Sequence, residues 1–387
     1  MRRRFSVRSG RKTEGNLTSR TDQRKLPPPK SVSISITGKC NLKCNYCFYA
    51  NEMEGLKDLP TATWMNFFSQ LGRIGIMDTS LTGGEALLRP DIFELIDGII
   101  ANRMRYNILS NGTLIDEKLL KKFEHGKRRL RLDYIQISID GSRAEIHNQS
   151  RPDSFDRAIR GVRLLKEAGV PIAVRTTINR TNLNDLENIA KLLLEDIGLN
   201  SFGTNEAMPI GSGCRSDAEM ALTSRQKMEA MATIGRLLRR YPGRLNAQAG
   251  PQAKRKMYAE MAHARRTGEM AKTWKMGFLT ACGCVFSKID ILHDGSIVPC
   301  CMLPGLVMGN ITSDSLLDVW HDHPTMKAIR ERRNIPMSEV PGCENCEWNQ
   351  YCNGSCPGMA HQLTGDFNRA NPEDCLKIFI KETGASY

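Results

Sequence analysis

The stretch that decides the fold runs from residue 31 to residue 47 and reads SVSISITGKCNLKCNYC. Its first part, residues 31–37, alternates serine with β-branched residues, which is typical of a strand. Three cysteines follow in the spacing C-x3-C-x2-C: Cys40, Cys44 and Cys47. Three thiolates at this spacing can hold three irons of a [4Fe–4S] cube and leave the fourth iron open to a small molecule. Buried structural cysteines or part of a zinc site are the alternative interpretations.

Short β-branched runs alternate with amphipathic stretches up to about residue 206. The expected strands are 31–37, 78–82, 105–110, 133–139, 171–178 and 200–206, and the expected helices lie near 61–73, 91–103, 113–124, 155–168 and 182–197. Each repeat takes about 30 residues, the size of a β-α unit. The alternation predicts an α/β fold with a parallel sheet covered by helices, in which ligands bind at the carboxyl ends of the strands.

Turn-forming and polar residues follow several of these strand ends. Each short motif, taken alone, is explained equally well by ordinary turn chemistry. Together they would face the same rim of the sheet as the cysteines. They are Gly83, Gly84, Glu85, Ser110, Asn111, Ser138 and Arg151.

The cysteine triplet, followed one β-α unit later by Gly83-Gly84-Glu85, resembles the radical SAM superfamily over roughly residues 31–207. The resemblance implies a partial (β/α)6 TIM-type barrel whose open iron binds S-adenosylmethionine (SAM). It places the two glycines and Glu85 beside the SAM amino group, and Tyr46 where the family has an apolar or aromatic residue. Rim residues would hold the ribose and carboxylate: Ser138 for the ribose, Arg151 for the carboxylate, with Ser110 and Asn111 nearby.

A second field of cysteines occupies the C-terminal quarter of the chain. Its spacing reads C-x12-G-x4-C and then C-x2-C-x5-C-x3-C, which resembles the SPASM extension of many radical SAM enzymes over about the last 105 residues. The resemblance implies two auxiliary [4Fe–4S] clusters, three in all, although C-x2-C pairs also suit zinc. Cys343, Cys346, Cys352 and Cys375 would hold the distal cluster, and Cys282, Cys300 and Cys356 the nearer one, with Cys284 as a possible fourth ligand.

Cys301 directly follows Cys300. Its position resembles that of an aspartate proposed as proton acceptor in anaerobic sulfatase-maturating enzymes. A thiol would copy that role poorly, although thiols readily donate hydrogen atoms, so formylglycine formation is disfavoured. Cys301 is therefore a candidate catalytic residue, and a buried or additional ligand cysteine is the alternative.

Composition is that of an ordinary globular protein, with 40% hydrophobic and 25% charged residues. No apolar run approaches the roughly 20 residues that cross a bilayer, and no signal peptide is evident, so we expect a cytoplasmic protein. About half of the net charge of +13 lies in residues 1–25. We expect four segments: a basic, disordered tail (1–29), the barrel (30–207), bridging helices (208–280) and the SPASM domain (281–387).

These features predict a radical SAM/SPASM enzyme that installs an oxidative crosslink in a ribosomal peptide or protein. The expected partners are that substrate, an electron donor such as flavodoxin or ferredoxin, and a separate leader-peptide-binding protein, with nucleic acid and membrane disfavoured. A tetrapyrrole or small-molecule maturase is the alternative enzyme. An iron–sulfur electron carrier or zinc-binding interaction protein is the alternative from another class.

Overall fold

The computed structural model describes residues 26–53, 57–215, 220–247 and 249–386. The basic tail expected over residues 1–29 therefore lies almost entirely outside the described part of the chain. Of its last residues, Leu26 and Pro27 are held by their carbonyl oxygens, which accept hydrogen bonds from His321 and Trp320.

One sheet of ten strands organises the molecule, in the order β10-β9-β8-β1-β2-β3-β4-β5-β6-β7. Neighbouring strands from β1 to β7 pair in parallel, and β8 pairs in parallel with β1. Strand β9 pairs antiparallel with β8, and β10 pairs antiparallel with β9. The strands are β1 (Ser31–Thr37), β2 (Asp78–Gly83), β3 (Arg105–Ser110), β4 (Leu132–Ser138), β5 (Ile172–Ile178), β6 (Phe202–Glu206), β7 (Leu245–Asn246), β8 (Lys288–Ile291), β9 (Ser296–Val298) and β10 (Gly309–Asn310).

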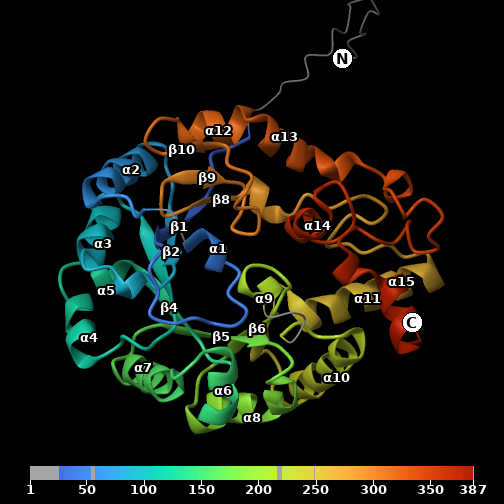
Figure 1. Cartoon of the computed structure of the whole chain (residues 1–387), viewed down its shortest axis with the longest axis horizontal. Helices are drawn as coiled ribbons and strands as arrows, with labels where there is room; N and C mark the ends of the chain where they lie inside the picture. Colours follow the sequence, from blue (N-terminus) through green and yellow to red (C-terminus); the bar gives the residue numbers. More distant parts are fainter. Residues whose placement is uncertain (1–25, 54–56, 216–219, 248, 387) are drawn as a thin grey trace, which may run out of the picture.

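Helices cover the outer face of the curved sheet, and α1 (Ala50–Met53) lies inside the curve beside the cysteine loop (Figure 1). The sequence explains this for α2, whose buried residues Trp64, Phe67, Phe68 and Leu71 recur at helical spacing on one face. The covering helices are α2 (Thr61–Arg73), α3 (Ile92–Ala101), α4 (Glu117–Phe123), α5 (Arg128–Arg131), α6 (Ala144–Ser150), α7 (Phe155–Glu167) and α8 (Leu186–Lys191).

The predicted partial (β/α)6 barrel is confirmed, and each of its six strands starts and ends within two residues of the expected bounds. The sequence did not indicate that the sheet continues past β1. Strand β8 pairs with the free edge of β1, with Ser31 opposite Lys288, so that the C-terminal segment extends the barrel sheet directly.

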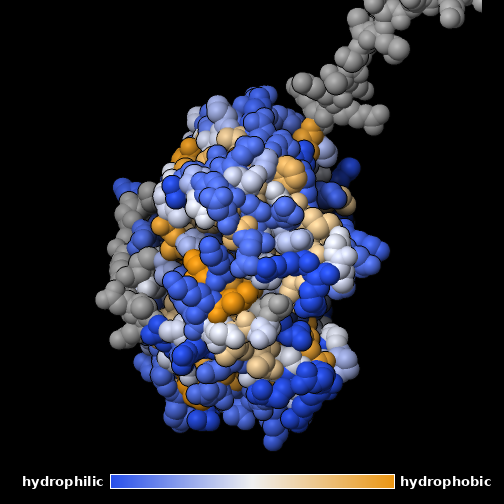
Figure 2. Space-filling model, turned by 90° about the vertical axis from the view of Figure 1, so that its right-hand side faces the viewer, coloured by the Kyte–Doolittle hydropathy of each residue, from blue (hydrophilic) through white to orange (hydrophobic). Residues whose placement is uncertain are grey.

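Of the remaining helices in the described residues, three lie between the barrel and the C-terminal segment and four lie within that segment. They are α9 (Ser212–Arg215), α10 (Ser224–Arg240), α11 (Gly250–Thr267), α12 (Leu316–Asp322), α13 (Pro324–Glu331), α14 (Pro357–Thr364) and α15 (Leu376–Thr383). The side of the molecule that carries α10, α11 and α15 is largely hydrophilic, with scattered apolar patches (Figure 2). None of the helices in the described ranges is both long and apolar enough to span a membrane.

Candidate functional site

The cysteine loop leaves the carboxyl end of β1 and is fixed at its start by Asp58. One carboxylate oxygen of Asp58 accepts a hydrogen bond from Thr37 Oγ1 at 2.6 Å, and the other accepts one from the Gly38 N–H at 2.7 Å. Within the loop, the Cys47 N–H donates to the carbonyl oxygen of Cys44 at 3.2 Å. The three cysteines are thus held on a short, hydrogen-bonded turn.

The thiols of the first triplet lie close enough to interact electrostatically. Burial, followed by the neighbouring Cys44 thiol, raises the pKa of Cys47 to about 11. Burial likewise raises the pKa of Cys40, and the nearby Cys44 thiol adds to the rise. Three converging thiols whose ionised forms repel one another are suited to an iron–sulfur cluster, because the metal stabilises the thiolates.

Gly83 and Gly84 pack directly on this loop. A Cβ atom at Gly83 would lie 2.2 Å from the carbonyl oxygen of Thr37, and one at Gly84 would lie 2.2 Å from that of Lys39. Gly83 also has a φ of 131°, which favours glycine. The Gly84 N–H donates to the Thr37 carbonyl at 2.9 Å. Only residues without side chains let β2 approach the cysteine loop so closely.

Glu85 joins the ends of β2 and β3. Its side chain is buried and accepts hydrogen bonds from Ser110 Oγ at 2.9 Å, the Asn111 N–H at 2.7 Å and the Leu87 N–H at 3.1 Å. The Asn111 side-chain amide in turn donates to Asn41 of the cysteine loop at 2.9 Å. The structure therefore brings Glu85, Ser110 and Asn111 together beside the cysteines.

Arg151 and Tyr46 meet at the buried carboxylate of Asp140, a residue that the sequence analysis did not single out. Asp140 accepts hydrogen bonds from Arg151 Nε at 2.5 Å, from the Tyr46 hydroxyl, and from the Thr177 N–H at 2.7 Å. The Arg151 guanidinium also lies 3.7 Å from the Cys44 sulfur, so a fixed positive charge adjoins the first triplet. Ser138, at the end of β4, has no side-chain hydrogen bond among those the structure gives for the described residues.

Four C-terminal cysteines form a second group. Burial, then Cys346 and Cys375, raises the pKa of Cys343 to about 11. Burial also raises the pKa of Cys352 to about 11, and Cys375 and Cys343 contribute to the rise. Cys343 thus interacts electrostatically with Cys346 and Cys375, and Cys352 with Cys375 and Cys343.

The other five C-terminal cysteines are two close pairs and Cys356. The Cys282 thiol is hydrogen-bonded to that of Cys284, which lowers the pKa of Cys282, and Cys282 also acts on the buried thiol of Cys356. Cys300 and Cys301 form the second pair.

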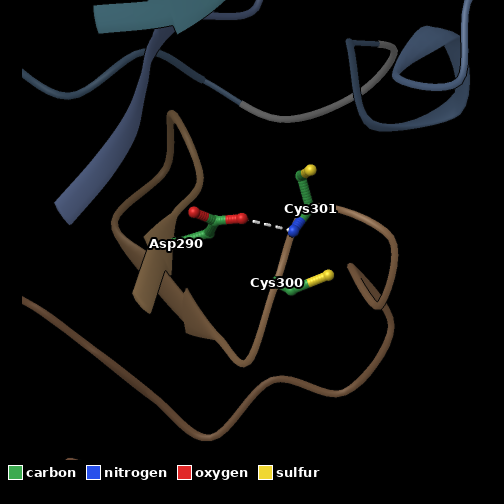
Figure 3. Close-up of side chains that lie close together, drawn as sticks. All are labelled: Asp290, Cys300 and Cys301. Atoms are coloured by element: carbon green, nitrogen blue, oxygen red, sulfur yellow. Dashed lines mark hydrogen bonds between the residues drawn. The ribbon is translucent and has the colours of Figure 1, made fainter. Parts of the chain in front are cut away.

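Asp290 lies beside the second pair (Figure 3). The ligand atoms of Asp290, Cys300 and Cys301 all lie within 4.8 Å of one another, and the Cys301 N–H donates to Asp290 at 2.5 Å. The two thiols leave the chain in different directions. Cys301 can therefore face a different space from its neighbour.

That space is a small cavity of about 30 Å³, bordered by both halves of the chain. Phe48, which follows Cys47, and Glu52 of α1 contribute from the cysteine loop, while Cys301 and Gln362 contribute from the C-terminal segment. Burial raises the pKa of Glu52. Sequence reasoning missed Glu52, because a single glutamate after an iron–sulfur motif carries no signal until the fold places it.

Arg332 is another residue that the sequence did not single out. Its side chain is fully buried and donates hydrogen bonds to the carbonyl oxygens of Thr280, Ser355 at 3.2 Å, Phe367 at 2.5 Å and Arg369 at 2.7 Å. Burial lowers its pKa to about 10, still well above neutral pH. One cation therefore holds together the loops that present the second cysteine field.

Two family profiles match the chain in the regions just described. Residues 34–193 match the radical SAM superfamily, and residues 282–347 match the SPASM iron–sulfur cluster-binding domain. The chain is a radical SAM enzyme with a SPASM domain. The two matched regions carry the first triplet and much of the second cysteine field.

Curated relatives of this radical SAM enzyme include heme synthases and peptide cyclases. An AdoMet-dependent heme synthase of Methanosarcina barkeri is 26% identical over 89% of the chain and 95% of the relative. A PqqA peptide cyclase of Granulibacter bethesdensis is 26% identical over 91% of the chain and 88% of the relative. Both similarities extend over barrel and SPASM regions alike.

Solved structures share the fold of the radical SAM enzyme. Streptococcus suis SuiB bound to its precursor peptide SuiA superposes with a TM-score of 0.69 at 17% identity, covering 91% of this chain and 77% of SuiB. The enzyme anSMEcpe with bound AdoMet gives a TM-score of 0.67 at 18% identity, covering 91% and 96%. Radical SAM and SPASM regions imply SAM and iron–sulfur clusters, and the converging thiols described above fit such clusters.

Proposed function

We propose that this radical SAM enzyme oxidises a ribosomally made peptide or protein and installs a crosslink or a related modification. One observation carries the proposal: a single cavity is lined by residues next to both cysteine fields, Phe48 beside Cys47 and Cys301 beside Cys300. A substrate carbon bound there would lie between the place where a radical is generated and the place where an electron can be removed.

We assign three clusters to the thiols. Cys40, Cys44 and Cys47 would hold the SAM-binding cluster, which, when bound and reduced, cleaves SAM to methionine and a 5′-deoxyadenosyl radical that takes a hydrogen atom from substrate. The auxiliary clusters would use the same ligands that the sequence predicts: Cys343, Cys346, Cys352 and Cys375 for one, and Cys282, Cys300 and Cys356, with Cys284, for the other. The hydrogen bond between Cys282 and Cys284 supports including Cys284.

The chain's own residues would position SAM and protect the site. Gly83 and Gly84 fix the cysteine loop by their close packing, and Glu85 orients the neighbouring strand end. Arg151, held by Asp140, offers a guanidinium to the SAM carboxylate, and Ser138 a hydroxyl to the ribose. The Cys301 thiol would face the substrate.

The peptide substrate is supported by the PqqA peptide cyclase relatives and by the fold shared with the SuiB–SuiA complex. A flavodoxin or ferredoxin would supply electrons, and a separate protein would present the leader peptide. We also propose the four-segment division of the chain into tail, barrel, bridging helices and SPASM domain, in which β8 of the last segment pairs with β1 of the barrel.

The second candidate is a tetrapyrrole maturase. It is favoured by heme synthase and Fe-coproporphyrin III synthase relatives, each 26% identical to this chain. Both candidates use the same radical chemistry, so only the substrate distinguishes them.

The test begins with the anaerobically reconstituted chain, SAM and dithionite. We expect about twelve irons per chain and production of 5′-deoxyadenosine. Replacing Cys40, Cys44 and Cys47 by Ala should remove about four irons and abolish SAM cleavage; persistent cleavage would contradict the assignment. Replacing Cys343 and Cys346 by Ala should spare SAM cleavage but abolish turnover.

The choice between substrates follows from turnover itself. The enzyme is incubated in parallel with peptides encoded beside its gene and with Fe-coproporphyrin III. A mass loss of hydrogen from a peptide supports the first candidate, whereas decarboxylation of the porphyrin supports the second.

A further inference from the structure

A buried network of charges joins the last barrel strand to the C-terminal cysteine field. Lys254 of α11 places its Nζ 2.9 Å from Glu206 Oε2, at the end of β6, and 2.8 Å from Asp374 Oδ1. Lys227 of α10 places its Nζ 3.7 Å from the other carboxylate oxygen of Glu206 and 2.5 Å from Glu373. The side chains of Lys227, Lys254, Glu206 and Asp374 are each at most 13% exposed.

Asp374 connects this network to two cysteines that we assign to different clusters. It precedes Cys375 in the chain, and its second carboxylate oxygen accepts a hydrogen bond at 2.5 Å from Ser355, which precedes Cys356. Burial raises the pKa of the Cys356 thiol, and the Asp374 carboxylate adds to that rise. The field of the network therefore reaches a cluster ligand.

Lys254 and Asp374 favour each other's charged forms. Burial alone would lower the pKa of Lys254, but Asp374 and Glu206 raise it above its usual value. Burial would raise the pKa of Asp374, but Lys254 more than offsets this and lowers it. Stability alone is a weak explanation for such a network, because burying ion pairs costs about as much as their attraction returns.

We propose that Lys254 and Glu206 set the reduction potentials of the auxiliary clusters that Cys356 and Cys375 would hold. The inference rests on the proposed function, and it makes both residues positioning residues for electron removal from substrate. Reduction adds one electron to a cluster, so a nearby ammonium favours the reduced form and a nearby carboxylate opposes it. No bond forms or breaks in this step, and no proton is required.

The test changes the charge in both directions in the reconstituted full chain. K254Q removes a positive charge and should shift the auxiliary potentials to more negative values. E206Q removes a negative charge and should shift them to more positive values. The double variant K254Q/E206Q restores the charge balance and should return the potentials close to those of the wild type.

Potentials are measured by redox titration monitored by electron paramagnetic resonance. The cluster whose signal changes on adding SAM is an internal control and should keep its potential in every variant. K256Q is the matched control on the same helix, because the Lys256 side chain is 68% exposed.

The sign of the shifts decides the outcome. Auxiliary potentials that stay at wild-type values in both single variants, or that move in the same direction, overturn the proposal, since a purely structural role would not give opposite signs. If K254Q loses iron, E206Q alone still tests the proposal. A more positive auxiliary potential in E206Q supports it, and an unchanged potential contradicts it. Failure of the proposed function is distinct: the wild type itself would then lack signals other than the SAM-sensitive one.

Discussion

Gly84 illustrates how the absence of a side chain can build a cofactor site. A Cβ atom at this position would lie 2.2 Å from the Lys39 carbonyl oxygen and 3.0 Å from the Cys40 Cβ. We expect G84A to push the cysteine loop away at a cost of about 1–3 kcal/mol. The variant should lose the SAM-binding cluster. The rate of SAM cleavage should fall at least about tenfold, which corresponds to about 1.4 kcal/mol.

Iron content and 5′-deoxyadenosine production measure this effect. Gly305→Ala is the matched control, because a Cβ atom there would meet nothing within 4 Å. A G84A protein with full iron content and normal cleavage would show that the loop tolerates the methyl group.

For single residues, the sequence predicts the candidate cluster ligands well and the residues that position them poorly. Cysteine spacing is local information, so both cysteine fields could be recognised before any fold was known. Asp140 could not be, because the Tyr46 hydroxyl that it binds is 94 positions away in the chain. The roles of Glu52 and Lys254 likewise could not be predicted, because their neighbours come from elements far away in the sequence.

Hydrogen bonds from the Arg332 guanidinium hold the loops of the C-terminal segment together. Four carbonyl oxygens, two of them in the loop that contains Phe367 and Arg369, accept hydrogen bonds from this one guanidinium. We expect R332M to leave them buried without donors, which should lower the free energy of unfolding by about 3 kcal/mol or more. R332K keeps the charge but lacks the planar fork, so it should restore only part of the loss.

Thermal unfolding under anaerobic conditions, together with iron content, checks this prediction. Arg333 is exposed and adjacent, so R333M is the matched control and should behave as the wild type. An R332M protein as stable as R333M would mean that water satisfies the four carbonyls.

Strands and helices of the barrel were predictable because their periodicity is regular. The π-helical turn after α8, at Leu192–Asp196, was not, because nothing in residues 182–197 distinguishes it from a continuous α-helix. Helix α11 ends at Thr267, because Gly268 adopts the left-handed conformation that terminates it.

For the whole molecule, the pairing of β1 with β8 sets a limit on how the chain can be divided. A chain ending at residue 280 would leave the edge of β1 unpaired, although Val32, Ile34 and Ile36 of that strand are fully buried. Exposed apolar edges recruit other chains. We expect this fragment to aggregate, whereas a chain ending at residue 314, which retains β8, β9 and β10, should remain dispersed.

Size-exclusion chromatography of the two fragments measures the difference. A monodisperse fragment 1–280 that binds its iron would instead support an independent barrel. Sequence reasoning placed a domain boundary near residue 281 because the second cysteine field begins at Cys282. Strand pairing across that boundary leaves no trace in the cysteine spacing.

The seam between β1 and β8 also governs timing. Strand β1 is among the first parts of the barrel to leave the ribosome, but its partner, Lys288–Ile291, is made much later. At a translation rate of about 5–20 residues per second, the edge of β1 stays unpaired for on the order of tens of seconds. The loop that carries the first three cysteines directly follows β1. We therefore expect iron to be inserted into this site after translation and not during it.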